Sequence, residues 1–569
     1  MLFEKILRIE KQLFEADRIA ISCDIGDGHW VDMTWGELFE IVGEVGRILH
    51  ESGVRKGDRI LLVGENHYKW LPVFLGITGS GAIAVPVDGS IADKRLAGVI
   101  ENCRPRVIVT SKKYQDKTAA LADQLQAKCS IVNFHFDLVR VCAENDTALA
   151  TPVVPEPEDP AAIIYTSGTT GRPKGTILSH RALCASIRIG LSLGDLKPND
   201  VMLALLPFTH VYGLVDTGLC PLAIGSKIVM TASYNPIEIL QAVARFRVSF
   251  LLVVPRLAEI FAMALRQMTQ PLPIPDITMI IGGASCDPKV IEALRSRGIR
   301  ALQGYGMTET AGGIIASIEG PVGAVGRASE DIAFKLEQVT NGVGELLISS
   351  PTLCSGIFGS EEETKAMFTG PFLRTGDLCE IDSEGYVHVR GRVKDIIIPP
   401  GGVNVYPDEL EMRLGLLPFA EEYVVLGFSE GGSEYPALIV RPSKAILQSK
   451  PPAEVAPQIE AEIRRLTADW PEWERFRRIQ VVATPLPRSA SQKVQRNRLV
   501  ELLSGAARPG GGAEAPKPVS DGPKTGPKPP VAPDTDIQHP YEVFQKIIGR
   551  FLHLEPGSIL RERRFDEFL

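Results

Sequence analysis

Short runs rich in β-branched residues alternate with helix-patterned segments between about residue 20 and residue 390. Strands that alternate with helices on this scale indicate βαβ units, in which helices cover both faces of a mainly parallel sheet. The runs that predict strands lie at 83–87, 106–110, 161–166, 227–230, 249–254 and 278–282. We therefore expect an α/β fold with a large N-terminal domain, at 1–392, of mainly parallel sheets flanked by helices.

The pattern becomes smaller in scale after residue 392. Strands are predicted near 423–428 and 436–441, and a helix is predicted near 457–467, where apolar residues recur at helical spacing. These elements indicate a separate α+β unit. We expect a smaller C-terminal domain at 393–504.

The last part of the chain differs in composition. Residues 505–540 contain nine prolines and six glycines and almost no large apolar side chain, which predicts a disordered linker. Apolar residues then line one face of a predicted helix within 541–569. That segment is too short for an autonomous domain.

Two apolar stretches raise the question of a membrane segment. Residues 1–20 mix apolar positions with Glu and Lys, which predicts an amphipathic helix and not a signal peptide. Residues 70–87 form an uncharged stretch of 18 positions, which only just reaches a spanning length. Because prolines and glycines interrupt it, a buried helix that runs into a buried strand fits better. No membrane span is expected.

The composition of the 569 residues narrows the class of protein. About 100 to 200 residues per domain predicts three or four folding units. With 44% apolar and 23% charged residues and a net charge of −8, the chain has material for cores and no general attraction to nucleic acid or anionic lipid. The nine cysteines form no CxxC pair, so we expect reduced thiols in a cytoplasmic protein.

The densest chemical signal is the segment from Tyr165 to Gly175, which directly follows a predicted strand. Its glycines let backbone N–H groups turn inward, and its hydroxyls and one lysine add further donors and a cation, which suits a polyphosphate. Pro173 stands where a P-loop has its second glycine. The candidate phosphate-binding residues are Thr166, Ser167, Gly168, Thr169, Thr170 and Lys174.

A second segment runs from Gly304 to Thr310, after a βαβ-like stretch that begins near residue 278. Paired glycines at a strand end let a flat ring approach the backbone, and an aromatic side chain can stack on that ring. A hydroxyl and a carboxylate stand beside it, and Mg²⁺ usually takes one or two carboxylates plus phosphate oxygens. The candidate residues are Gly282, Gly283, Ala284, Tyr305, Thr308 and Glu309.

Two further segments complete the set. Asp377 follows a glycine in RTGD, where an aspartate on a glycine turn can accept from both hydroxyls of a ribose, and Arg392 stands in GRVKD. Lys493 is one lysine in a polar loop near the end of the small predicted domain.

In this order and spacing, the four segments resemble the core motifs of the superfamily of ATP-dependent adenylate-forming enzymes. This superfamily contains acyl- and aryl-CoA synthetases, adenylation domains and luciferase-like proteins, and the resemblance covers about residues 20–500. It implies a large N-terminal domain and a mobile C-terminal domain. It also implies two half-reactions: a carboxylate attacks the α-phosphorus of ATP to give acyl-AMP and pyrophosphate, and a thiol then displaces AMP.

The resemblance implies a role for each candidate residue in the large domain. It assigns the β- and γ-phosphates to the loop 166–174 and Mg²⁺ to Glu309. By the same resemblance, Tyr305 and residues 282–284 would lie around the adenine, and Thr308 would contact the α-phosphate. Asp377 and Arg392 would hold the ribose.

For the small domain, the resemblance implies that Lys493 bridges the carboxylate and the α-phosphate when the domain closes. Lys394 resembles the hinge about which that domain then turns to admit the thiol. Gln492 departs from the usual pattern, in which a glycine precedes the lysine.

The segment from Pro207 to Gly213 resembles the proline-aromatic-His segment of fatty-acyl and aryl-acid ligases, in which His210 would line or gate the acyl pocket. The alternative is a core histidine. Amino-acid adenylation domains usually place an Asp near here, and Asp216 is nearby but out of pattern. We expect an apolar carboxylic acid, fatty or aryl; the alternatives are an amino-acid-type adenylation domain and a non-catalytic adenylate-binding homologue.

The thiol acceptor is open between CoA and the phosphopantetheine of a carrier protein. Residues 541–569 resemble the first helix and loop of an acyl carrier domain, and they end before the serine that would bear phosphopantetheine. Either the sequence is a fragment of a longer protein with an attached carrier, or CoA is the acceptor.

Two other enzyme classes have partial motifs. The run from Gly190 to Gly194 matches the G-x-S-x-G of serine hydrolases, but it follows a helical pattern where a nucleophile elbow needs a strand. The run from Gly79 to Ala84 partly fits a dinucleotide fingerprint, but it leads into a strand where that fingerprint needs a helix.

Overall fold

The computed structural model of the chain describes most of residues 16–503. The ranges are 16–26, 28–134, 138–140, 155–167, 173–231, 233, 235–267, 276–316, 320–329, 331–400, 403–415, 417–449, 451–488 and 494–503. Within them the strands form four sheets. The predicted linker at 505–540, the carrier-like segment at 541–569 and most of the helix predicted at 1–20 lie outside these ranges.

The first eight-stranded sheet has the order β15-β14-β13-β12-β10-β11-β1-β2 and is parallel except at its two edges. Its strands are β1 (Ile19–Asp24), β2 (Trp30–Thr34), β10 (Val201–Ala204), β11 (Lys227–Met230), β12 (Phe250–Val253), β13 (Thr278–Ile281), β14 (Arg300–Met307) and β15 (Gly312–Ala316). Since β1 begins at Ile19, the helix predicted for residues 1–20 is wrong at its C-terminal end.

The second eight-stranded sheet has the order β18-β9-β8-β4-β3-β5-β6-β7, with parallel pairing at its centre. Its strands are β3 (Arg59–Val63), β4 (Ile83–Val87), β5 (Val107–Thr110), β6 (Ser130–Asn133), β7 (Leu138–Arg140), β8 (Pro160–Ser167), β9 (Pro173–Ser179) and β18 (Gly356–Ile357). Strand β4 is buried along its whole length. This confirms the sequence reading of residues 70–87 as a helix followed by a buried strand.

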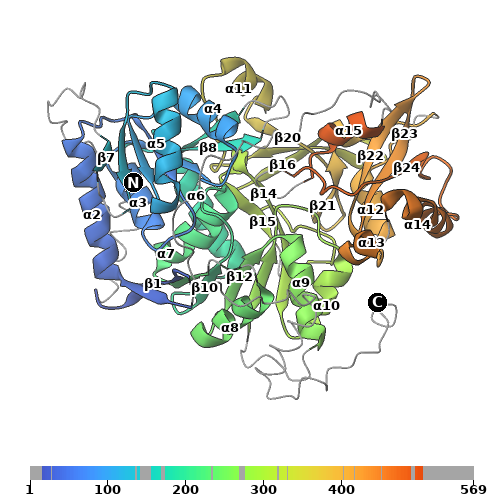
Figure 1. Ribbon diagram of the computed structural model, residues 1–569, viewed down its shortest axis with the longest axis horizontal. Helices are drawn as coiled ribbons and strands as arrows, with labels where there is room; N and C mark the ends of the chain where they lie inside the picture. The colour runs from blue at the N-terminus through green and yellow to red at the C-terminus, as the bar shows by residue number, and fades with distance from the viewer. Residues whose placement is uncertain are drawn as a thin grey trace, which may run out of the picture.

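Helices cover these sheets (Figure 1). They are α2 (Trp35–Glu51), α3 (Trp70–Gly79), α4 (Asp93–Cys103), α5 (Gln115–Gln124), α6 (His180–Gly194), α7 (Cys220–Ile224), α8 (Pro236–Phe246), α9 (Pro255–Gln267) and α10 (Pro288–Arg295). One apolar core contains residues of both large sheets and of α2, α3 and α6, including Trp35, Trp70 and Phe74. The two sheets are therefore packed around a shared core, which fixes their relative position.

A third sheet contains β16 (Ala333–Thr340), β17 (Val343–Ser349), β19 (Phe368–Thr369), β20 (Phe372–Ile381) and β21 (Val387–Arg392), with α11 (Glu361–Met367) beside it. The C-terminal domain has the sheet β22-β23-β24. Its elements are α12 (Pro407–Leu414), β22 (Ala420–Glu430), β23 (Ser433–Pro442), α13 (Lys444–Ser449), α14 (Pro452–Leu466), β24 (Arg478–Val481) and α15 (Arg496–Leu503). These elements lie together at one end of the molecule (Figure 1).

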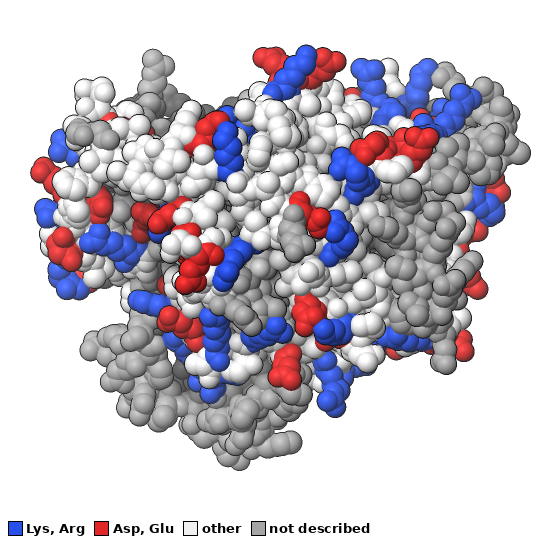
Figure 2. Space-filling view, turned by 180° about the vertical axis from the view of Figure 1, so that it is seen from behind, with Lys and Arg blue, Asp and Glu red and all other residues white. Residues whose placement is uncertain are grey.

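Charged side chains of both signs are interspersed on the face seen in Figure 2. This mixed surface agrees with the modest net charge of −8. In the part of the chain that the structure describes, no helix is long and apolar enough to cross a membrane.

The two rival enzyme motifs lie in the wrong local structure. Gly190 to Gly194 forms the end of helix α6, where Ser192 is exposed on the helix surface and not on a strand-to-helix turn. Gly79 to Ala84 connects the end of α3 to β4. Neither segment has the strand-turn-helix geometry that its motif requires.

Candidate functional site

Asp377, Tyr305 and Arg392 form a hydrogen-bonded group where the first sheet meets the third. The Tyr305 hydroxyl donates to Asp377 Oδ2 at 2.7 Å, and Arg392 Nε donates to Asp377 Oδ1 at 2.7 Å. Burial, and then the charge of Asp377, raise the pKa of Tyr305 well above its ordinary value, so the phenol keeps its proton and donates. A carboxylate has about four lone-pair sites, so two remain for hydroxyl donors of a ligand.

The local backbone explains this geometry. Asp377 on β20 and Arg392 on β21 are direct cross-strand partners, which brings their side chains together. Gly376 has a φ of +68°, which favours glycine, and the pairing of β20 with β17 shifts register near this position. The prediction that Asp377 lies on a glycine turn is therefore wrong in part. Asp377 lies inside strand β20, next to an irregularity in the pairing of β20 with β17.

The paired glycines predicted beside adenine follow the end of β13. Gly283 has a φ of +84°, a conformation that L side chains rarely adopt. A Cβ at Gly282 would come within 3.0 Å of the ring of Tyr212, whose hydroxyl donates to the carbonyl of Ile280 at 3.0 Å. Bare backbone is thus required at this strand end, and Ala284 follows it directly.

The phosphate-loop candidates are only partly described. Thr166 and Ser167 end β8, and Lys174 lies at the start of the adjacent β9. Gly168, Thr169 and Thr170 lie outside the described residues. Lys174 Nζ forms an ion pair with Glu363 of α11 at 3.1 Å, and both side chains are partly exposed. A phosphate group would compete with this carboxylate for the lysine.

Thr308 and Glu309 lie on a single 3₁₀ turn, η3 (Thr308–Thr310), directly after β14. The Glu309 carbonyl accepts from the N–H of Cys354 at 2.8 Å, which fixes the backbone of the turn. Within the described ranges, no three His, Cys, Asp or Glu side chains gather as a metal-binding set. The donor set at Glu309 fits Mg²⁺ only as one carboxylate that adds to phosphate oxygens of a nucleotide, which is the usual pattern for this ion.

An apolar cavity adjoins the nucleotide candidates. Its free volume is about 70 Å³. One part of its lining consists of the strand-end positions Gly282, Gly283 and Tyr305, and another part consists of apolar side chains such as Leu193, Leu252 and Ile315. Backbone at a strand end and apolar side chains therefore line one cavity, as is usual for small-molecule sites.

His210 is half-buried and is not among the residues that line this cavity. Val211 and Tyr212 do line it. They lead into η2 (Tyr212–Leu219), a π-helix, and such wide helices occur often at functional sites.

The sequence reading set aside Asp216, and the structure places this residue in the cavity lining. It is 8% exposed, and burial raises the pKa of its carboxyl to about 7. A signal was available in the sequence, because Asp216 is the only charged residue between Val211 and Ile224. Its spacing did not match a known pattern, so spacing alone missed it.

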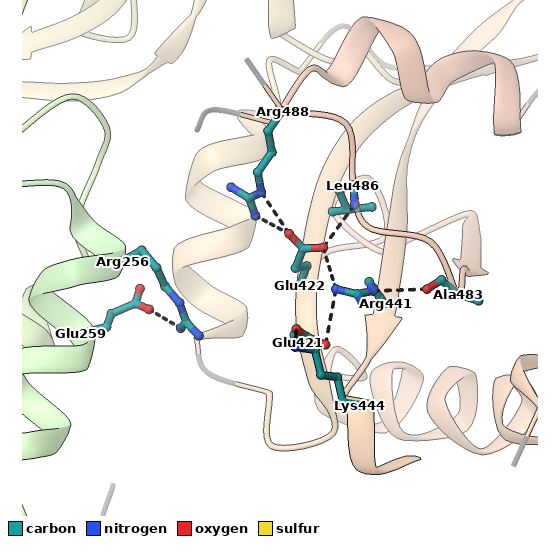
Figure 3. Close-up of polar contacts among 9 residues, drawn as sticks. All are labelled: Arg256, Glu259, Glu421, Glu422, Arg441, Lys444, Ala483, Leu486 and Arg488. Carbon is teal, nitrogen blue, oxygen red and sulfur yellow. Dashed lines mark hydrogen bonds and ion pairs between the residues drawn. The ribbon is translucent and has the colours of Figure 1, made fainter. Parts of the chain in front are cut away.

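Lys493 lies outside the described residues, but both ends of its loop are anchored. On one side, Arg488 donates to Glu422 of β22 at 2.7 and 3.0 Å, and the N–H of Leu486 donates to the same carboxylate (Figure 3). On the other side, Arg496 pairs with Asp408 and, at 2.8 Å, with Glu411.

Figure 3 also shows Arg256 and Glu259 of α9, in the large domain, opposite this part of the C-terminal domain. They pair with each other at 2.8 Å. These two charged side chains of the large domain are thus paired with each other and not with the C-terminal domain.

Comparison with known proteins gives consistent results. A family model described as AMP-binding enzyme matches residues 10–358. A feruloyl-CoA synthase from Amycolatopsis sp is 30% identical over 408 residues, 69% of this chain and 80% of that one. The long-chain-fatty-acid CoA ligase FadD13 of Mycobacterium tuberculosis is 28% identical over 429 residues, 72% of this chain and 83% of that one. The crystal structure of ATP-bound MatB from Rhodopseudomonas palustris matches with a TM-score of 0.73 and 26% identity, covering 88% of this chain and 98% of that one.

Proposed function

The chain belongs to the family of AMP-binding enzymes, and on this premise we propose that it activates an apolar carboxylic acid, fatty or aryl, with ATP. The products of the first step are an acyl-adenylate and pyrophosphate, and CoA then takes the acyl group. The observation that carries the proposal is one cavity whose lining combines Tyr305 and the bare strand end at Gly282 with apolar side chains.

The nucleotide would be held from three sides. Asp377 accepts from the ribose hydroxyls with the lone pairs that Tyr305 and Arg392 leave free. The adenine lies against the strand end at 282–284. Thr166, Ser167, Gly168, Thr169, Thr170 and Lys174 would contact the terminal phosphates, with Lys174 released from Glu363.

The first step brings two anions together. At 4 Å two unit charges repel by about 1 kcal/mol in water and about 4 kcal/mol at an effective dielectric of 20. Positioning and charge stabilisation therefore carry most of the catalysis of such phosphoryl chemistry. Mg²⁺, held by Glu309 and phosphate oxygens, would supply part of the neutralising charge, and Thr308 would contact the α-phosphate.

Lys493 would supply the remaining positive charge between the attacking carboxylate and the α-phosphate. The anchored ends of its loop, at Arg488 and Arg496, limit the positions that the loop can reach within the C-terminal domain. Lys394, exposed on the 3₁₀ turn η4 (Val393–Asp395), is the proposed hinge for the domain rotation that admits the thiol.

The substrate class and the acceptor rest on the relatives. One relative carries the name of an aryl-acid ligase, feruloyl-CoA synthase, and another that of a long-chain-fatty-acid CoA ligase. Both names include CoA, which favours CoA over a carrier-bound phosphopantetheine.

The test is carboxylate-dependent exchange of labelled pyrophosphate into ATP, with a panel of fatty and aryl acids. We expect Lys493→Ala to reduce exchange by at least about 100-fold, the usual cost of one charge-stabilising group, while supplied acyl-AMP is still converted to the thioester. Lys444→Ala, an exposed lysine of the same domain, is the matched control and should exchange normally. Exchange at the wild-type rate in the Lys493 variant would refute this role, and no exchange with any acid would refute the proposed function.

A further inference from the structure

Asp216 is the only charged residue in the cavity lining, among the residues that the structure describes. It lies on the π-helix η2, one turn after Tyr212, which lines the same cavity. The side chain is thus held inside the acyl-binding part of the site and not at the protein surface.

The two carboxyl oxygens of Asp216 have different surroundings. Oδ2 accepts from the N–H of Gly313 at 3.2 Å. In the described part of the chain, no cation and no second hydrogen-bond donor contacts this carboxyl group. The hydroxyls of Tyr212 and Thr217, on the same helix, donate instead to the carbonyls of Ile280 and Gly213. Oδ1 therefore retains its capacity to accept a hydrogen bond.

Glycines surround the carboxyl group from two other elements. A Cβ at Gly190 of α6 would lie 3.4 Å from Oδ1, and a Cβ at Gly313 of β15 would lie 3.3 Å from the same atom. A Cβ at Gly312 would lie 3.0 Å from Oδ2. The bare backbone of these three glycines thus packs closely around the carboxyl group, and none of them adds a side chain that could pair with it.

A carboxyl group with one partner is costly to ionise inside an apolar cavity, and a further hydrogen bond would lower that cost. A donor on the ligand would supply it. Hydrogen bonds to a charged group are about twice as strong as neutral ones, and a site with a buried acceptor discriminates against a ligand that leaves it unpaired.

We propose that Asp216 selects an otherwise apolar acid that carries a hydrogen-bond donor, a hydroxyl or an amino group, on the part remote from the reacting carboxylate. This inference rests on the proposed function and narrows its substrate class. The donor would lie between η2 and β15, in the cavity that Gly282 and Tyr305 also line.

The experiment compares matched acids by kcat/KM in pyrophosphate release. One series is cinnamate with a para hydroxyl, amino or methyl group, and the other is a linear alkanoate with a terminal hydroxyl, amino or methyl group. In at least one series we expect the wild-type enzyme to prefer a donor-bearing acid over its methyl analogue by at least about 10-fold. The hydroxyl and amino arms show which donor the site takes.

Two variants test the role of the side chain. Asp216→Asn keeps the shape and the bond to Gly313 and should reduce an amino preference most, whereas Asp216→Val should bring every preference to within about 3-fold of unity. Asp331→Asn, at an exposed pair with Arg188, is the control. Thermal unfolding and ATP binding verify that each variant is folded.

The experiment distinguishes failure of the inference about Asp216 from failure of the proposed function. If methyl acids react as well as donor acids in the wild-type enzyme, or if the preference survives Asp216→Val, the inference is wrong and the proposed function stands. If no acid supports pyrophosphate release, the proposed function fails and the inference fails with it.

Discussion

Asp216 in the large domain and Glu411 in the C-terminal domain are acidic groups withdrawn from water, and their surroundings differ. Burial raises the pKa of both carboxyl groups. Glu411 accepts from Arg496 at 2.8 Å and from the N–H of Val425 at 2.7 Å. Among the residues that the structure describes, Asp216 accepts only from the N–H of Gly313. The chain compensates one acid internally and leaves the other for a ligand.

This difference separates a structural role from a binding role. Arg496 also pairs with Asp408 of α12 and lies 3.7 Å from Asp395 of the hinge turn, so its group connects α15, α12 and η4. The group thus links three elements of the C-terminal domain close in sequence to Lys493. Asp216 connects nothing except η2 and β15, around an open cavity.

The largest change in stability is expected when Glu411 loses its partner Arg496. Arg496→Met leaves Glu411, Asp408 and Asp395 without their shared cation. Removal of one partner from a fully buried charge group costs about 3–5 kcal/mol, and this partly buried group should lose less than that. Hydrogen–deuterium exchange should show lower protection in peptides from α12 and β22. Unchanged protection there would mean that the group does not stabilise the domain.

Removal of the charge of Asp216, which has no cationic partner among the described residues, should instead raise the free energy of unfolding. Asp216→Asn keeps the acceptor for Gly313 and should raise the free energy of unfolding at pH 8 by at most about 4 kcal/mol, since one pKa unit is about 1.4 kcal/mol. The native carboxyl has its pKa near 7, against 3.8 for the ordinary group, so the native state binds the extra proton. Its contribution to stability is therefore fully present below pH 4 and is lost as the pH rises to 7.

Denaturant unfolding at pH 4.5 and pH 8 measures this difference. The stabilisation by Asn should be larger at pH 8. Equal effects at both pH values, or destabilisation at pH 8, would mean that Asp216 has a partner in the folded protein.

Asp377 is an intermediate case, because both of its oxygens are engaged and it should still accept from a ligand. Tyr305→Phe removes one donor and leaves the carboxylate less well oriented. We expect the KM for ATP to rise about 10-fold with kcat changed less than about 3-fold, in line with a hydrogen bond to a charged group. Tyr386→Phe, whose hydroxyl bonds Arg327 elsewhere, should leave the KM for ATP unchanged.

The smallest effect is expected for an exposed pair. Arg464 and Glu460 lie one turn apart on α14 with side chains 55% and 42% exposed. Arg464→Met should change the free energy of unfolding by less than about 0.5 kcal/mol. A change comparable to that of Arg496→Met would show that burial does not separate the two arginines.

Much of the fold follows from local patterns. The buried run 83–87 and the runs near 227 and 278 are strands, because continuous β-branched residues suit sheets covered on both faces. The helix predicted through Ala20 is wrong at its end, because Ile19–Asp24 pairs with two other strands. Pairing with distant strands overrode the local periodicity.

Some residues of the candidate site can likewise be predicted from the sequence, and others can be recognised only from the fold. The place of Asp377 after a glycine predicts a ribose acceptor, and the family resemblance implies the same role for Arg392. Their contact follows from the pairing of β20 with β21. Asp216 was set aside because its relevance depends on Gly190 and Gly313, which are distant in sequence and meet it only in the fold. Sequence spacing cannot encode a cavity lined by separate elements.

The central claim is that a carboxylate oxygen attacks the α-phosphorus of ATP. An acid labelled with ¹⁸O at both carboxyl oxygens, incubated with ATP, CoA and the enzyme, tests this directly by mass spectrometry of the products. The account predicts one ¹⁸O in AMP, because the bridging oxygen leaves with AMP when the thiol attacks the carbonyl carbon. Label in inorganic phosphate, or thioester formed with unlabelled AMP, would contradict it.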